Sequence, residues 1–151
     1  MTWDYVDIDG QGMKVEQLDQ KGITVAHVSP EHHFPIGLVM PVGRRQELLR
    51  WAAEEPERYI VEMILTVSSA WLANPSLPCS PWIRNHRVIY INTFSKTMVP
   101  SLRIGYMVLP EKLMERYYST MNFYSCTVSG FEQYAMAAFL EGGYLSGTFG
   151  D

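Results

Sequence analysis

The first half of the chain alternates between strand-like and helix-like patterns of hydrophobic positions. The β-branched run ITVAHVS (23–29) lies between a glycine and a proline and predicts a strand. The segment from Pro41 to Pro56 has apolar residues at helical spacing, which predicts a helix that begins and ends near these prolines. The run RYIVE (58–62) predicts a second strand. A strand, a helix and a strand in this order predict a parallel strand pair and an α/β fold class.

The second half of the chain repeats the two patterns in a different order. The runs RVIYIN (87–92) and RIGYMVL (103–109) predict two further strands. The segment 110–124 predicts a helix with proline in its first turn, and the segment 129–143 predicts another helix that ends at two glycines. Ser129 begins an S-x-x-E pattern, which is typical of a capping box at a helix N-terminus.

The segment 63–86 interrupts these patterns. Its first part, MILTVSSAWLANPSLPCSPWI (63–83), contains no charged residue and follows neither the helical nor the strand period. We therefore set 63–86 apart as an anomalous segment within a single domain that spans residues 1–151.

Composition narrows the class of protein. The chain has 151 residues, 47% of them hydrophobic and 19% charged, which is enough for one domain with a core. The net charge is −4 and the basic residues do not cluster, so this chain has no electrostatic footprint for DNA or RNA. Cys79 and Cys126 lack C-x-x-C spacing, which favours free thiols over a metal site or a disulfide. Without a secretory leader or a long apolar run, we expect a soluble, cytoplasmic chain with no membrane contact.

The lysine between the last two predicted strands is the candidate for chemistry. A lysine amine reacts with carbonyls when desolvation or a nearby cation lowers its pKa, as in the Schiff-base lysine of pyridoxal phosphate (PLP) enzymes. The phosphate of PLP favours hydroxyls and an arginine fork, and TFSKTMVPSLR (93–103) offers both around Lys96. On spacing alone, an ordinary polar turn at Lys96 and a solvated arginine at Arg103 are the more usual interpretation.

A family resemblance favours the PLP interpretation. The stretch RVIYINTFSKTMVPSLRIGYMVLP (87–110) resembles the lysine segment of fold-type-I aminotransferases, and more narrowly the aminotransferase-like domain of MocR-type regulators of the GntR superfamily. The upstream stretch 6–62 resembles the same family, with HVSPEHHFPIG (27–37) in place of a His-Gln-aromatic-Pro-Thr-Gly loop. The resemblance implies part of the large domain of such an enzyme, a three-layer α/β/α arrangement around a mostly parallel sheet.

The resemblance also implies roles for individual residues. Lys96 matches the lysine that forms the internal aldimine with PLP, and Arg103 matches the arginine that binds the PLP phosphate. Thr93 matches a hydroxyl that contacts the phosphate, and Ser95 is a second hydroxyl candidate. His32 matches the histidine of the loop beside the PLP ring. No metal site is expected, because the adjacent histidines lack both helical ligand spacing and a carboxylate cluster.

The chain departs from the family pattern at the acid that should partner the pyridine nitrogen. In the family this acid follows the strand that matches RYIVE, whereas here Glu62 is followed by Met63. Codons that can encode 66–82, read from the third base, give SEFRLAGKPIPALQSM, which resembles the segment that the family has at this place. The hypotheses are a pair of compensating frameshifts around 63–86 or a genuine hydrophobic insertion, which the gene sequence distinguishes. Two substitutions in the histidine loop, His33 for glutamine and Ile36 for threonine or serine, are further departures.

Three functions follow from these observations. The first is a PLP-dependent aminotransferase-like domain that acts on a small amino compound. The second is an effector-sensing PLP domain of a MocR-type transcription regulator, which binds without turnover and contacts DNA only through a winged-helix domain absent from this chain. The third is an inactive truncated or frameshifted product. The resemblance implies a homodimer for the parent protein.

Overall fold

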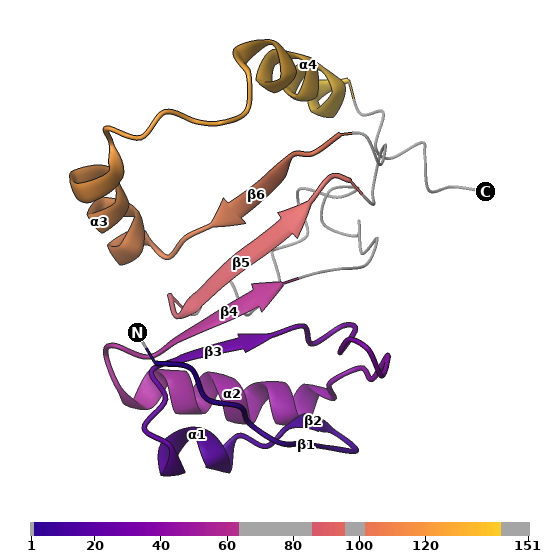
Figure 1. Cartoon of the computed structure of the whole chain (residues 1–151), viewed down its shortest axis with the longest axis vertical. Helices are drawn as coiled ribbons and strands as arrows, with labels where there is room; N and C mark the ends of the chain where they lie inside the picture. Colours follow the sequence, from indigo (N-terminus) through magenta and orange to yellow (C-terminus); the bar gives the residue numbers. More distant parts are fainter. Residues whose placement is uncertain (1, 64–85, 96–101, 143–151) are drawn as a thin grey trace.

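The computed structural model describes residues 2–63, 86–95 and 102–142. Figure 1 shows a sheet with two helices towards its first strand and two towards its last. The strands and helices, in chain order, are β1 (Ile8–Asp9), β2 (Gly12–Met13), α1 (Glu16–Gln20), β3 (Val25–Val28), α2 (Val42–Glu54), β4 (Tyr59–Met63), β5 (Val88–Thr93), β6 (Gly105–Val108), α3 (Glu111–Met121) and α4 (Gly130–Glu141).

The main sheet has the order β3-β4-β5-β6, with the first three strands parallel and β6 antiparallel to β5. Glu62 of β4 lies in register with Val28 of β3 and with Tyr90 of β5. Thr93 at the end of β5 pairs with Gly105 at the start of β6. The carboxyl ends of β3, β4 and β5 and the amino end of β6 therefore share one edge of the sheet (Figure 1), which we call the carboxyl edge.

Helix α2 covers one face of the sheet and forms the main core. Alternate residues of the strands face it, because side chains along a strand point to opposite faces. The core contains side chains from β2, α1, β3, α2, β4 and β5 and the loops between them: Met13, Val15, Leu18, Ala26, Val28, Met40, Leu48, Trp51, Ala52, Ile60 and Val88. A second cluster joins Phe94 and Ile104 at the carboxyl edge to Met136 of α4.

The structure confirms the mixed α/β class, the mostly parallel sheet and the parallel pair of the βαβ unit. The predicted capping box of α4 is present: the Ser129 hydroxyl accepts from the Glu132 backbone N–H at 3.3 Å, and the Ser129 N–H donates to the Glu132 carboxylate at 3.2 Å. The sequence patterns did not predict the β1–β2 hairpin or α1. Most of the anomalous segment 63–86 lies outside the described residues. In the described part of the chain, no helix is both long and apolar enough to cross a membrane.

Candidate functional site

The carboxyl edge brings the ends of the lysine loop together. Lys96 itself lies outside the described residues, directly after Ser95. The Ser95 hydroxyl donates to the Leu102 carbonyl at 2.6 Å, and the Phe94 N–H donates to the Ile104 carbonyl at 2.9 Å. These bonds join the residues before the loop to those after it.

Two of the predicted phosphate-binding residues flank this closure. Thr93 is exposed at the last position of β5, and Arg103 is exposed two residues before β6 begins. The pairing of Thr93 with Gly105 keeps the end of β5 beside the chain that carries Arg103. The Thr93 hydroxyl and the Arg103 guanidinium thus belong to adjacent segments of the chain at the carboxyl edge. A hydroxyl and a guanidinium together are suited to a phosphate group.

A buried polar group supports the end of β5. Asn92, which is 5% exposed, donates from Nδ2 to the Tyr90 hydroxyl at 3.1 Å and accepts from the Thr93 N–H at 2.6 Å. The Tyr106 ring lies 5.1 Å from the Phe94 ring and 6.1 Å from the Tyr90 ring, measured between centroids. This packing fixes the backbone immediately before the lysine loop.

The histidine loop lies at the same edge, after β3. The His33 N–H donates to the Leu38 carbonyl at 2.9 Å, and the Gly37 N–H donates to the His33 carbonyl at 2.8 Å. Gly37 has a φ of 71°, a conformation that L-residues with side chains rarely adopt. The Met40 N–H donates to the Pro30 carbonyl at 2.8 Å and closes the base of the loop.

A cavity of about 280 Å³ lies where this loop meets the ends of β3 and β4. Its lining residues are His27, Val28, Ser29, His33, Phe34 and Met63. None of these residues is acidic. His33 places its Nδ1 in a buried position without a hydrogen-bond partner among the described residues.

The histidines that line the cavity are not the histidine that the resemblance predicts to lie beside the cofactor ring. His32, the predicted cofactor neighbour, is half-buried but does not line the cavity, whereas His33 and His27 do. His27 was missed by sequence reasoning. Its signal was the alternation of β3, which places His27 on the face opposite to the core residues Ala26 and Val28.

Glu62 is the acidic residue nearest in sequence to the position where the family has the acid that partners the pyridine nitrogen. Its side chain faces away from this cavity. It is 5% exposed and lies in register with Val28 and Tyr90, on the face that α2 covers. Met63, the next residue, lines the cavity on the opposite face. Burial raises the pKa of Glu62 to about 7, the positive charge of Arg45 opposes this rise, and the negative charge of Glu31 adds to it.

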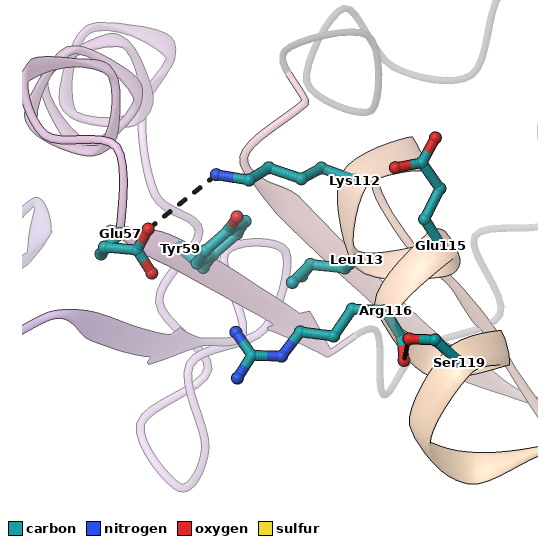
Figure 2. A pocket seen from close by; sticks show the side chains of 7 residues that line it. All are labelled: Glu57, Tyr59, Lys112, Leu113, Glu115, Arg116 and Ser119. Atoms are coloured by element: carbon teal, nitrogen blue, oxygen red, sulfur yellow. Dashed lines mark hydrogen bonds and ion pairs between the residues drawn. The ribbon is translucent and has the colours of Figure 1, made fainter.

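A larger cavity, of about 540 Å³, lies at the other edge of the sheet between the start of β4 and α3. Figure 2 shows Lys112 reaching from α3 towards Glu57, with Nζ 3.9 Å from the carboxylate, beside Tyr59. Ligands of open α/β sheets bind outside the carboxyl ends of the strands. The smaller cavity is therefore the better candidate for the site that includes Lys96.

The residues present fit PLP in part. Thr93 and Arg103 are suited to its phosphate, and the cavity beside the histidine loop is lined by an aromatic ring, two imidazoles and a thioether. The pyridine nitrogen of PLP usually has a charged partner. No carboxylate of the described residues lines the cavity. Residues suited to the phosphate are therefore present, but the described residues supply no acid for the ring.

Comparison with known proteins shows what this chain is similar to. No family model matches the sequence. The chain is 37% identical over 135 residues to the HTH-type transcriptional regulator YhdI of Bacillus subtilis (strain 168), covering 89% of this chain and 29% of that protein. It is 28% identical over 139 residues to the regulatory protein MocR of Rhizobium meliloti, covering 92% of this chain and 29% of that protein.

A solved structure is similar over the same length. The crystal structure of Pyrococcus horikoshii kynurenine aminotransferase, determined in complex with PMP, matches with a TM-score of 0.67 and 31% identity. The match covers 93% of this chain and 37% of that one. The chain spans about 30% of the length of the curated relatives it matches, so it corresponds to one portion of these proteins.

Proposed function

We propose that this chain, which is part of an aminotransferase-like domain of fold type I related to MocR-type regulators of the GntR superfamily, binds PLP through Lys96. The observation that carries the proposal is the strand register at the carboxyl edge. It brings Thr93, Arg103 and the ends of the lysine loop to the edge where the histidine-lined cavity lies.

Each residue has a separate task in this proposal. The amine of Lys96 would hold PLP at its aldehyde carbon. Arg103 and Thr93 bind the phosphate, with Ser95 as a second hydroxyl, and the histidine loop with His32 borders the ring. When bound, PLP supplies an electron sink for carbanions of amino compounds.

The residues that line the cavity favour PLP binding without catalytic turnover. An electron sink is strongest when the pyridine nitrogen stays protonated beside a carboxylate, and the described lining residues include none. We therefore place the effector-sensing interpretation ahead of transamination. The parent protein would then bind DNA through a separate HTH domain, as the names of its relatives suggest, and would form a homodimer. An inactive product of an altered reading frame remains the alternative without a ligand.

The test is a visible-absorbance titration of the purified chain with PLP. We expect a band above the PLP background that Lys96→Ala abolishes, while Lys112→Ala, a lysine of the other cavity, leaves it unchanged. Arg103→Gln should weaken PLP binding about ten-fold or more, because it removes a charge-assisted contact. Absence of a Lys96-dependent band in the folded chain would leave only the inactive product. Ketoacid release from an amino acid would instead favour an enzyme over a sensor.

A further inference from the structure

The larger cavity is not used by the proposed PLP site. It has a volume of about 540 Å³ and lies between the start of β4 and helix α3. The carboxyl edge, where β5 ends at Thr93, is at the opposite end of the strands (Figure 1). A cavity of this size can hold a small molecule. Its lining residues therefore indicate which kind of molecule would fit.

The base of this cavity is an aromatic ring that the sheet holds in place. Tyr59, the first residue of β4, is 8% exposed, and its N–H donates to the Thr24 carbonyl at 2.9 Å. The guanidinium carbon of Arg87 lies 5.8 Å from the centroid of the Tyr59 ring, and Arg87 also donates to the Pro56 carbonyl. Leu113 of α3, which is half-buried, lines the cavity as well. The cavity thus offers a fixed apolar surface to a ligand.

Two cationic side chains border this apolar surface. Figure 2 shows Lys112 and Arg116 reaching from α3 towards the start of β4, with Leu113 between them. Residues four apart on a helix lie on the same face, so both cations point to one side of α3. Lys112 Nζ lies 3.9 Å from the Glu57 carboxylate, and the two side chains are 69% and 73% exposed. An ion pair as exposed as this one contributes little to stability, so Lys112 can leave Glu57 at small cost.

The charge that this cavity leaves without an opposite charge is the guanidinium of Arg116. The ion pairs formed within the described part of the chain do not include Arg116. Glu115, the second acidic residue of the lining, points away from Tyr59 in Figure 2. The Ser119 hydroxyl donates to the Arg116 carbonyl at 2.9 Å and so is used inside the helix. The cavity is therefore suited to a ligand with a negative charge.

The surroundings of Arg116 narrow the class of anion. The planar guanidinium binds a carboxylate through two parallel hydrogen bonds. A single negative charge matches one arginine without a partner, whereas a phosphate dianion would be repelled by the nearby Glu57. A small inorganic anion would leave the ring of Tyr59 and the side chain of Leu113 without a contact.

We propose that the larger cavity binds a small monocarboxylate with an apolar body. Arg116 binds the carboxylate, and Lys112 turns from Glu57 to add a second positive charge. Tyr59 and Leu113 contact the apolar part of the ligand. This inference does not rest on the proposed function, because none of these residues belongs to the proposed PLP site.

The test is a titration of the chain with 3-phenylpropanoate, followed through the backbone amide signals in ¹⁵N NMR spectra. We expect saturable shifts for the amides of 57–59 and 111–119, with a dissociation constant of about 1 mM, typical of a ligand of this size. Arg116→Gln should raise the dissociation constant about ten-fold or more, because it removes a charge-assisted contact. The uncharged analogue 3-phenylpropanamide should bind the unmodified chain more weakly by a similar factor.

Arg50→Gln is the matched control, because Arg50 is an exposed arginine of α2 that lines neither of the two cavities. Arg50→Gln and Lys96→Ala should both bind the probe like the unmodified chain. The amide spectrum of each variant without the probe reports on its fold. The proposal is overturned if the unmodified chain shows no saturable shifts, or if Arg116→Gln or the amide analogue binds as tightly as the original pair. Shifts at the carboxyl edge that Lys96→Ala abolishes would assign the probe to the cofactor site, and would overturn it as well.

Discussion

At the scale of single residues, Glu62 and Met63 show how the alternation of a strand assigns neighbouring residues to different faces of the sheet. The two residues are neighbours in sequence, but Glu62 faces the core below α2 and Met63 faces the cavity. A carboxylate at position 62 therefore does not compensate for an absent carboxylate at position 63. The resemblance already indicated that Glu62 is not the partner of the cofactor ring, and the register of β4 supplies the physical reason.

The raised pKa of Glu62 makes the stability of the chain depend on pH. The folded chain holds this proton up to about pH 7, whereas the unfolded chain has the ordinary glutamate pKa of 4.5. The folded state therefore holds more protons in this window, and stability falls as the pH rises through it. The loss at Glu62 amounts to at most about 3 kcal/mol once both states are ionised.

Replacing Glu62 should remove this dependence. We expect the free energy of unfolding of Glu62→Gln to exceed that of the unmodified chain by an amount that grows from pH 5 to pH 8. Urea unfolding at both pH values measures the difference, with Glu47→Gln as the exposed control. A difference that stays constant with pH would show that the Glu62 carboxyl group ionises alike in both states.

At the scale of elements, α4 depends on its N-terminus more than on burial. Met136 is its one buried residue, so packing contributes little, while the capping box satisfies backbone groups that would otherwise be open. Ser129→Ala should destabilise the α4 region by about 1 kcal/mol. Ser119→Ala is the matched control, because the Ser119 hydroxyl only bonds back to the Arg116 carbonyl inside α3. Hydrogen exchange of α4 amides measures the effect, and equal results for both variants would contradict it.

The elements that the sequence predicted are those with a sustained period. Helices α2, α3 and α4 and the four strands of the main sheet have enough residues for the hydrophobic pattern to appear. The β1–β2 hairpin has two residues per strand, too few for a pattern, and it depends on contacts from far along the chain. Arg44 of α2 donates to the Met13 carbonyl at 2.6 Å and pairs with Asp9 at 2.8 Å.

The candidate site likewise has a part that could be predicted from the sequence and a part that could not. The resemblance implies that Thr93 and Arg103 serve one phosphate, and the antiparallel pairing of β5 and β6 keeps the backbone segments that carry them adjacent. The cavity wall could not be predicted from the histidine motif, because it combines His27 of β3 with His33 of the loop. That combination requires the folded path of the 30–40 segment, which its hydrogen bonds between His33 and Leu38 and between Met40 and Pro30 determine.

At the scale of the whole molecule, large apolar side chains remain exposed on the side of β6. Figure 1 shows α3 and α4 beyond this strand, and Phe123, Phe131 and Tyr134 are 79%, 82% and 81% exposed. Exposed apolar patches of this kind mark interaction surfaces or cause aggregation. The chain also matches only about 30% of the length of its relatives, so these side chains are candidates for burial by other parts of a longer protein.

We therefore expect the isolated chain to self-associate through α4. Replacing both Phe131 and Tyr134 with lysine should shift the population towards monomer, because two charges would have to be desolvated at the contact. Trp3→Lys is the control, since Trp3 is equally exposed, at 83%, but is next to Asp4, which pairs with Lys21 directly after α1. Sedimentation velocity over a range of concentrations measures the shift. An equal shift for Trp3→Lys would assign the association to general hydrophobicity. No shift for either variant would assign it to another surface, such as β6, which is an edge strand of the sheet formed by the described residues.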